Sequence, residues 1–347
     1  MRTLGLDSSD VLDFSASVSP LGPPKGLWEA LQGVDLTAYP DPECLELKEA
    51  LAELHGLDVD HVLVGNGSTE LIHLLARSYL NQPIGGVERS VLTFTPTYGE
   101  YSGAGLLEGA KIREVAACRE AGFAWDLERA AELIATRKPA LAFLCNPNNP
   151  TGVYLGSEDV AGLVLAAKGS GTLLVLDEAY VNFVEDRWDA TSLLEGSARK
   201  SVVLLRSMTK DYALTGLRLG YALASPEVVS RLGRLQPDWS VNSLAQIGGL
   251  YALADTGYLP GARRAVGEAK DFLLESFKQM GFHPLPSVAN YLLVEVGDGA
   301  VWREKLMRRG LFVRDCASFG LPDCIRIGIR AMPDCRRLVG AMMAEVD

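Results

Sequence analysis

The middle of the chain alternates short apolar runs with amphipathic segments. The apolar runs are hydrophobic on both faces, and they cover residues 62–65, 90–94, 141–145, 172–176, 201–205 and 221–224. Strands of this kind are typical of a sheet that is buried between two layers of helices. Helical spacing of apolar residues follows in the intervening segments, over 43–55, 68–80, 126–136 and 157–168. The alternation predicts an α/β fold in which a mostly parallel sheet forms the centre of an α/β/α sandwich.

The two ends of the chain differ from this middle part. Residues 1–35 are rich in proline and glycine, which predicts an extended N-terminal arm that packs with a small domain. Residues 36–235 form the predicted large domain, and residues 236–347 form a smaller α+β domain. The expected elements of the smaller domain are a helical stretch over 243–281, strands over 290–296 and 324–329, and a helix over 333–346.

Composition and charge exclude several classes of protein. Of the 347 residues, 48% are apolar and 22% are charged, as in ordinary globular proteins and unlike disordered or fibrous chains. The net charge of −11 leaves no basic surface for nucleic acid or for an anionic membrane. The first residues do not resemble a signal peptide, and no apolar run reaches 18 residues. These features predict a soluble, cytoplasmic protein.

The cysteine and histidine residues give no metal-binding pattern. Six cysteines and four histidines are scattered along the chain, and the sequence contains no C-x-x-C motif. We therefore expect free thiols in a reducing compartment and no metal site.

Polar clusters follow several of the predicted strands. They are Gly65-Asn66-Gly67-Ser68-Thr69-Glu70, Asn146-Pro147-Asn148-Asn149-Pro150-Thr151-Gly152, Asp177-Glu178-Ala179-Tyr180 and Ser207-Met208-Thr209-Lys210. Open α/β sheets bind their ligands beyond the carboxyl ends of the strands, so these clusters are candidates for one site. Each cluster alone also has a purely structural interpretation, as a capped turn, an extended loop, a helix cap or a surface lysine.

The order of these clusters resembles that of a known family. The motifs N-P-x-N-P-T-G, D-E-A-Y, S-x-T-K and G-L-R-L-G-Y resemble fold-type I pyridoxal phosphate enzymes of the class I/II aminotransferase superfamily, over nearly the full chain. Finer motifs resemble the threonine-phosphate decarboxylases of cobalamin biosynthesis, a family close to histidinol-phosphate aminotransferase. They occupy residues 13–24, 39–44, 65–72, 209–221, 239–246, 314–321 and 325–330.

The resemblance implies a role in cofactor binding for several residues. Lys210 corresponds to the lysine that bonds to the aldehyde of pyridoxal phosphate, and Asp177 corresponds to the partner of its ring nitrogen. Asn149 and Tyr180 correspond to the groups that hydrogen-bond its phenolic oxygen, so the expected catalytic residues are Lys210, Asp177 and Tyr180. The remaining cofactor contacts implied are the stacking ring of Tyr98, the phosphate partners Ser68, Thr69, Ser207 and Arg218, and Tyr39 from the partner subunit. A homodimer with shared sites is therefore expected.

The resemblance also implies a substrate site. Arg326 corresponds to the arginine that binds the substrate carboxylate as a bidentate pair, and Arg314 corresponds to an arginine that meets the substrate phosphate. Arg330 is expected on the same strand face as Arg326 because the two are an even number of residues apart. Ser318 and Asn149 complete the predicted substrate contacts. For Arg314, a structural ion pair with Asp315 or Asp323 is the alternative.

Two functions share all of these cofactor residues. The first is decarboxylation of L-threonine O-3-phosphate to (R)-1-aminopropan-2-yl phosphate and CO2, and the alternative is transamination of histidinol phosphate or another amino acid. The outcome depends on which bond at Cα stands perpendicular to the cofactor ring, which the sequence does not reveal. Ser19-Pro20-Leu21-Gly22 favours the decarboxylase, because histidinol-phosphate enzymes tend to carry Asn-Pro-Tyr-Gly at this place.

Two further interpretations come from other classes. Ser207-x-x-Lys210 matches the nucleophile pattern of penicillin-recognising acyl enzymes, but the K-T-G motif that these enzymes require is absent. A non-catalytic relative with a binding or regulatory role is disfavoured because Lys210, Asp177 and Arg326 are all present.

Overall fold

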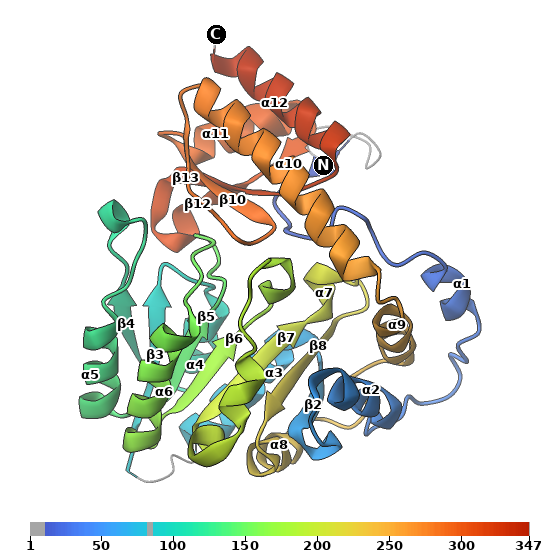
Figure 1. The fold of residues 1–347 in the computed structure, drawn as a ribbon, viewed down its shortest axis with the longest axis vertical. Helices are drawn as coiled ribbons and strands as arrows, with labels where there is room; N and C mark the ends of the chain where they lie inside the picture. The colour runs from blue at the N-terminus through green and yellow to red at the C-terminus, as the bar shows by residue number, and fades with distance from the viewer. Residues whose placement is uncertain (1–10, 82–85, 347) are drawn as a thin grey trace.

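Two β-sheets lie one above the other in the computed structural model, which describes residues 11–81 and 86–346 (Figure 1). The lower and larger sheet has seven strands among these residues. In spatial order they are β2 (Val62–Asn66), β8 (Leu219–Ala224), β7 (Val202–Ser207), β6 (Leu173–Asp177), β5 (Pro139–Cys145), β3 (Glu88–Thr95) and β4 (Lys111–Ala116). The six strands predicted from apolar runs are all present.

The strand directions in the large sheet bring the polar clusters that follow the strands to one edge. β4, β3, β5, β6 and β7 are parallel, whereas β8 is antiparallel to both of its neighbours, β7 and β2. The ends of β2, β3, β5, β6 and β7 therefore meet the start of β8 at the same edge. This arrangement confirms the prediction of a mostly parallel sheet.

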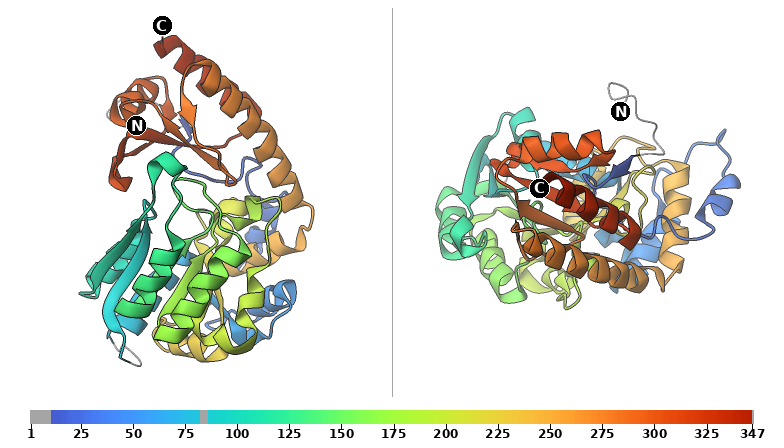
Figure 2. Two further views of the ribbon diagram at one scale, coloured as in Figure 1. Left: turned by 60° about the vertical axis from the view of Figure 1, so that its left-hand side comes forward. Right: turned by 90° about the horizontal axis from the view of Figure 1, so that it is seen from above.

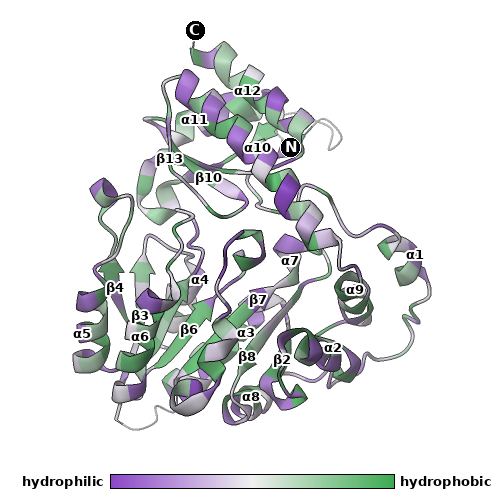
Figure 3. Cartoon of the chain, viewed as in Figure 1, coloured by the Kyte–Doolittle hydropathy of each residue, from purple (hydrophilic) through white to green (hydrophobic). Residues whose placement is uncertain are grey.

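Helices cover both faces of the large sheet, so its strands are buried on both sides. Within β5, Leu141 and Phe143 pack in one apolar cluster, and Ala142 and Leu144 pack in another. The first cluster includes α3 (Gly67–Asn81), α4 (Glu100–Leu107) and α8 (Pro226–Gly233); the second includes α2 (Leu45–His55), α5 (Leu127–Arg137) and α6 (Ser157–Ser170). Figure 3 shows the apolar strands between helices whose outer surfaces are polar. The predicted α/β/α sandwich is confirmed.

The sequence pattern did not predict every element. β4 lies at the sheet edge and carries exposed lysine and glutamate side chains and a half-buried arginine, so it lacks the continuous apolar run of a central strand. The helical stretch over 243–281 is two helices, α9 (Ser243–Ala254) and α10 (Tyr258–Gln279). They are separated by a turn in which Asp255 accepts a hydrogen bond from the Gly257 amide at 3.1 Å.

The upper sheet has four antiparallel strands among the described residues. They are, in order, β12 (Arg314–Cys316), β13 (Leu321–Gly328), β10 (Tyr291–Glu295) and β9 (His283–Pro284). α10 and α11 (Gly299–Arg308) pack with this sheet, and α12 (Met332–Val346) packs against these two helices. The long α10 rises to the sheet from the large one in Figure 2. The strands expected over 290–296 and 324–329 and the final helix are present.

The described part of the N-terminal arm runs alongside the upper sheet. β1 (Leu12–Asp13) pairs in parallel with β11 (Leu311–Phe312), and the Gly328 amide donates to the Phe14 carbonyl at 2.7 Å. α1 (Leu27–Gln32) follows farther along the arm and packs with α9. The first ten residues of the predicted arm, including those examined for a signal peptide, lie outside the described residues. The domain boundaries at residues 35 and 235 stay a prediction.

No helix within residues 11–81 and 86–346 combines the length and the apolar character needed to cross a lipid bilayer. All six cysteines fall in these ranges, and none of them forms a disulfide, as the sequence predicted.

Candidate active site

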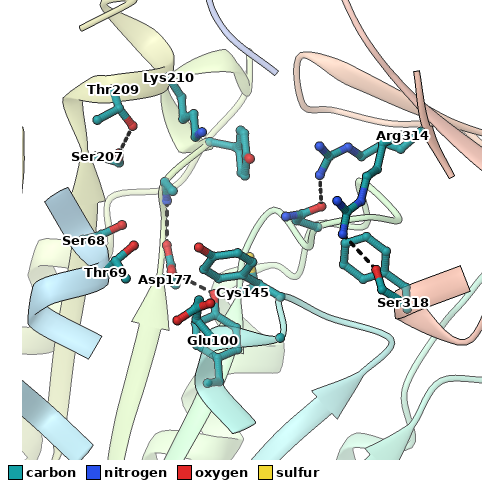
Figure 4. Close-up of a pocket in the computed structure, with 18 of the residues that line it drawn as sticks. Ser68, Thr69, Glu100, Cys145, Asp177, Ser207, Thr209, Lys210, Arg314 and Ser318 are labelled. Carbon is teal, nitrogen blue, oxygen red and sulfur yellow. Dashed lines mark hydrogen bonds between the residues drawn. The ribbon is translucent and has the colours of Figure 1, made fainter. Parts of the chain in front are cut away.

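A cavity of about 550 Å³ lies where the carboxyl edge of the large sheet faces the small sheet (Figure 4). Most of the residues that the sequence proposed for the site line this one cavity. They are Ser68, Thr69, Tyr98, Asn149, Asp177, Tyr180, Ser207, Lys210, Arg218, Arg314, Ser318 and Arg326. They come from six segments that are far apart in the sequence, and the fold brings them together because the large strands end at one edge that faces the small sheet.

Two predicted site residues lie elsewhere. Tyr39 is 79% exposed, and its ring is stacked on Trp239 with the ring centroids 4.6 Å apart. Its predicted contact belongs to a partner subunit, so its position outside this cavity leaves that prediction untested. Arg330 does not line the cavity: its guanidinium pairs with Asp334 at 2.9 Å. β13 ends at Gly328, so the two-residue period that placed Arg330 on the same face as Arg326 does not extend to it. Arg330 therefore lies outside this cavity in the structure, and its predicted role in the substrate site stays a prediction.

Lys210 and Asp177 point into the cavity from neighbouring strand ends (Figure 4). Burial lowers the pKa of Lys210, and the nearby cations Arg326 and Arg218 lower it further. This shift favours a neutral amine, the form that can attack an aldehyde or accept a proton. Burial raises the pKa of Asp177, although its Oδ2 accepts from the Tyr101 hydroxyl at 2.8 Å and its Oδ1 accepts from the Ala179 amide at 3.0 Å.

A group of small donors surrounds the start of α3. Ser68 and Thr69 lie in its first turn, and Ser207, which also lines the cavity, shares a hydrogen bond of 2.6 Å with nearby Thr209. The guanidinium of Arg218 fits against Gly67, whose φ is +75°; a Cβ at position 67 would lie 2.6 Å from its Nη2. Only glycine leaves this space and tolerates this backbone conformation. Hydroxyl groups, a helix N-terminus and an arginine together form a suitable cradle for a phosphate.

Two tyrosines and an asparagine complete the wall between the sheets. Tyr180 is buried, and this burial raises the pKa of its hydroxyl. Tyr98 follows β3 and lies edge-on to Tyr101, with the ring centroids 5.6 Å apart. Asn149 is held by Arg326, whose Nη1 donates to the amide oxygen.

The two arginines on the small sheet have no acidic partner within the described part of the chain. Arg326 is 8% exposed, donates from Nη2 to the Ser15 carbonyl at 2.7 Å, and has a buried Nε without a hydrogen-bond partner. Arg314 donates to the Ser318 hydroxyl at 2.9 Å and lies over the Phe319 ring. Asp315 and Asp323, the partners proposed for a structural Arg314, instead pair with Arg303 and Arg119. The structure therefore disfavours that alternative.

Sequence analysis missed several residues that line the cavity. They are Ser15, Gly99, Glu100, Tyr101, Cys145, Ala179, Thr209 and Phe319. Thr209 lies inside the S-x-T-K motif, which was a signal for it, and Tyr101 follows Tyr98 by three residues at the start of α4. Ser15 had none, because only the pairing of the arm with the small sheet brings it to the site.

This donor set fits pyridoxal phosphate. Three features match the three polar ends of that cofactor: the phosphate cradle, the amine of Lys210 and the buried carboxylate of Asp177. Among the described residues, this carboxylate has hydrogen-bond donors but no ion-pair partner, and a protonated ring nitrogen would supply one.

A family model described as aminotransferase class I and II matches residues 6–342. The chain belongs to this family. Its members depend on pyridoxal phosphate, and its fold is the fold-type I architecture predicted from the motifs. The family therefore assigns the cofactor whose chemistry the cavity fits.

The relatives carry two kinds of names. A histidinol-phosphate aminotransferase of Symbiobacterium thermophilum is 37% identical over 99% of this chain and 92% of its own length. A provisionally named threonine-phosphate decarboxylase of Caldanaerobacter subterraneus subsp. tengcongensis is 31% identical over 94% of this chain and 88% of its own. Among solved structures, histidinol-phosphate aminotransferase from Sinorhizobium meliloti in complex with pyridoxal-5'-phosphate has a TM-score of 0.84 and 26% identity, covering 99% of this chain and 92% of that one.

Proposed function

We propose that this pyridoxal phosphate enzyme acts at Cα of a small amino compound that carries a phosphate. The observation behind the proposal is the pair Arg314 and Arg326, which line the cavity of Lys210 without a carboxylate partner in the described residues. Two cations without counter-ions favour a substrate with anionic groups, even in a protein of net charge −11. Arg326, being buried and fixed by Asn149 and Ser15, suits a planar carboxylate, and Arg314 with Ser318 suits a phosphate.

The site residues divide the work of such a reaction. When bound, pyridoxal phosphate supplies an electron sink for the bonds at Cα of an amine joined to its aldehyde. Lys210 would hold the cofactor through its aldehyde, and its lowered pKa supports proton transfer at Cα. Asp177, whose carboxylate is fixed by Tyr101, would stabilise a positive charge on the ring nitrogen. Tyr180 and Asn149 would hydrogen-bond the phenolic oxygen.

Transamination of histidinol phosphate has the stronger support from the comparisons. Relatives with 37% and 35% identity over nearly the whole chain bear the name histidinol-phosphate aminotransferase. The second anion site also suits this reaction, because the amino donor glutamate carries two carboxylates.

Decarboxylation of threonine phosphate has support from this chain's own residues. The arm segment Ser19-Pro20-Leu21-Gly22 lacks the tyrosine that the resemblance assigns to histidinol-phosphate enzymes. Leu21 is 48% exposed and does not line the cavity, whereas Ser15 of the arm does. Threonine phosphate also brings a carboxylate and a phosphate in one molecule, matching Arg326 and Arg314. A relative with 31% identity carries the corresponding name provisionally.

One pair of assays separates the two reactions. The holoenzyme is given threonine phosphate, and released CO2 is measured; a second sample receives histidinol phosphate and 2-oxoglutarate, and glutamate is measured. CO2 release without glutamate formation supports the decarboxylase, and the reverse result supports the aminotransferase. Lys210→Ala, assayed in both, controls for reactions outside this site. If the enzyme turns over neither compound, that result contradicts the proposal of a phosphorylated substrate.

A further inference from the structure

The turn at residues 118–124 reaches from the large sheet to the small one. It lies between β4 and α5, and Figure 1 shows this part of the chain rising toward the small sheet. At its tip, Arg119 donates to both carboxylate oxygens of Asp323 on β13, at 3.2 and 2.5 Å. Its Nη2 is also 3.3 Å from Glu295 at the end of β10, the strand paired with β13. A bidentate guanidinium–carboxylate pair fixes orientation as well as separation.

A second side chain attaches the same turn to the small sheet. Phe123 is 2% exposed and packs in an apolar cluster with Leu293, Cys316, Leu321 and Cys324. Its φ is +65°, a left-handed conformation that is unfavourable for a bulky residue. The surrounding packing therefore has to hold Phe123 in place, which makes the turn a specific contact rather than a chance approach of two loops.

The base of the turn is attached to the catalytic edge of the large sheet. The Ala117 amide donates to the Thr95 carbonyl at 2.8 Å, and the Trp125 ring nitrogen donates to the same carbonyl at 3.1 Å. Thr95 ends β3, three residues before Tyr98 in the cavity wall. The turn thus links the sheet that carries Lys210 to the sheet that carries the two arginines, and neither Arg119 nor Phe123 lines the cavity.

We propose that residues 118–124 form a clasp that holds Arg314 and Arg326 at their working distance from Lys210. Asp323, which Arg119 grips, precedes Arg326 by three residues on the same strand. Cys316 and Leu321, on which Phe123 packs, flank the short segment that presents Ser318 below Arg314. Arg119 and Phe123 are therefore positioning residues for the anionic groups of the substrate. This inference rests on the proposed function only for the identity of those groups.

The clasp differs in its consequences from an ordinary surface ion pair. Arg119 and Asp323 are 37% and 28% exposed, and an ion pair of this exposure adds little to overall stability. A purely structural pair would leave the kinetics unchanged when removed. A positioning pair would weaken substrate binding while the cofactor site, which the clasp does not touch, stays intact.

The test compares Arg119→Gln with Arg129→Gln, which removes an exposed pair with Glu132 on α5. We expect Arg119→Gln to raise KM for the phosphorylated substrate about tenfold, with kcat within about threefold and cofactor affinity unchanged, since small misplacements of binding groups are costly. Arg129→Gln should match the parent. Charge reversal provides the rescue: Arg119→Asp should behave like Arg119→Gln or worse, and adding Asp323→Arg should restore most of the loss. Equal KM values in parent and Arg119→Gln would overturn the clasp.

Amide hydrogen exchange gives a readout that does not depend on turnover. In Arg119→Gln the segment 311–328 should exchange faster than in the parent, while 62–81 should be unchanged. If the parent turns over no phosphorylated compound but this exchange difference appears, the proposed function fails and the clasp stands. If the parent is active and neither KM nor exchange changes in Arg119→Gln, the clasp fails and the proposed function stands.

Discussion

Arg314 and Arg326 are register partners on the antiparallel strands β12 and β13, and both side chains line the cavity of Lys210. Directly opposite residues share a face of a sheet, where two like charges repel each other. The nearby acidic residues are engaged elsewhere, Asp315 by Arg303 and Asp323 by Arg119. An anion bound between the arginines would relieve this repulsion, which supports the proposed negatively charged substrate.

Arg314→Ala should therefore weaken the use of phosphorylated substrates. We expect the activation free energy that governs kcat/KM to rise by at least about 2 kcal/mol, the scale of a lost charge-assisted hydrogen bond. The unphosphorylated amino acid should be a poor substrate of the parent and change little in the variant. Arg308→Ala, which removes an exposed arginine paired with Glu304 on α11, is the matched control. If Arg314→Ala keeps the parent's preference for the phosphorylated compound, the substrate phosphate binds to another residue.

Lys210→Ala should abolish covalent attachment of the cofactor. Borohydride reduction of the parent should leave the cofactor's mass on the chain after denaturation, and peptide mapping should find it at residue 210. The variant should bind the cofactor reversibly, lose it on denaturation and show no turnover. Lys168→Ala serves as control because that lysine is exposed and bonds only to Ser197 in the described residues. Full activity in Lys210→Ala contradicts the assignment.

Asp177→Asn should preserve the shape of the site but remove the charge that keeps the ring nitrogen protonated. We expect kcat to fall on the order of 10³-fold, about 4 kcal/mol. Tyr101→Phe removes only the hydrogen bond of 2.8 Å to this carboxylate, so its loss should be much smaller. Steady-state kinetics of both variants test this order. A loss below tenfold in Asp177→Asn would mean that another group holds the nitrogen.

Tyr39 tests the expected dimer. It is 79% exposed and stacked on Trp239, away from the cavity of its own chain. If it reaches the cofactor phosphate of a partner subunit, Tyr39→Phe should lower cofactor affinity without dissociating the dimer. Light scattering at micromolar concentration measures the mass, and cofactor titration measures the affinity. A stable, fully active monomer is the result that removes the shared-site prediction.

His55 should make the protein less stable in mild acid. Burial lowers the pKa of His55 to about 4 from its usual 6.5, and its Nε2 lies 2.9 Å from the Tyr221 hydroxyl. The unfolded chain therefore binds a proton between pH 6.5 and 4 that the folded chain does not, so stability falls as the pH falls through this window. Over this pH window, we expect the free energy of unfolding to fall by up to about 3 kcal/mol less in His55→Gln than in the parent. Urea unfolding at several pH values measures it, with the exposed His283→Gln as control.

The sequence by itself determined the central sheet and most of the cofactor site. Runs such as 141–145 and 172–176 are apolar on both faces, and only a strand covered by two helix layers can bury them. The segment after each run carries its polar cluster, and parallel strands end at one edge. Asp177, Asn149 and Lys210 were therefore expected to lie together. The edge strand β4 escaped this reasoning because its exposed face is charged.

Only the tertiary structure decided the substrate side of the cavity. The two-residue period placed Arg330 with Arg326, but β13 ends at Gly328, and a strand end depends on its pairing partners rather than on its own residues. The local sequence allowed Arg314 to pair with Asp315 or Asp323, but Arg303 on α11 pairs with Asp315 and the distant Arg119 pairs with Asp323. Ser15 reaches the site because the arm pairs with β11 and packs against β13. Contacts between segments hundreds of residues apart, such as Ser15 with Arg326 and Arg119 with Asp323, leave no local pattern of polarity, so only the packing of the arm and the turn against the small sheet revealed them.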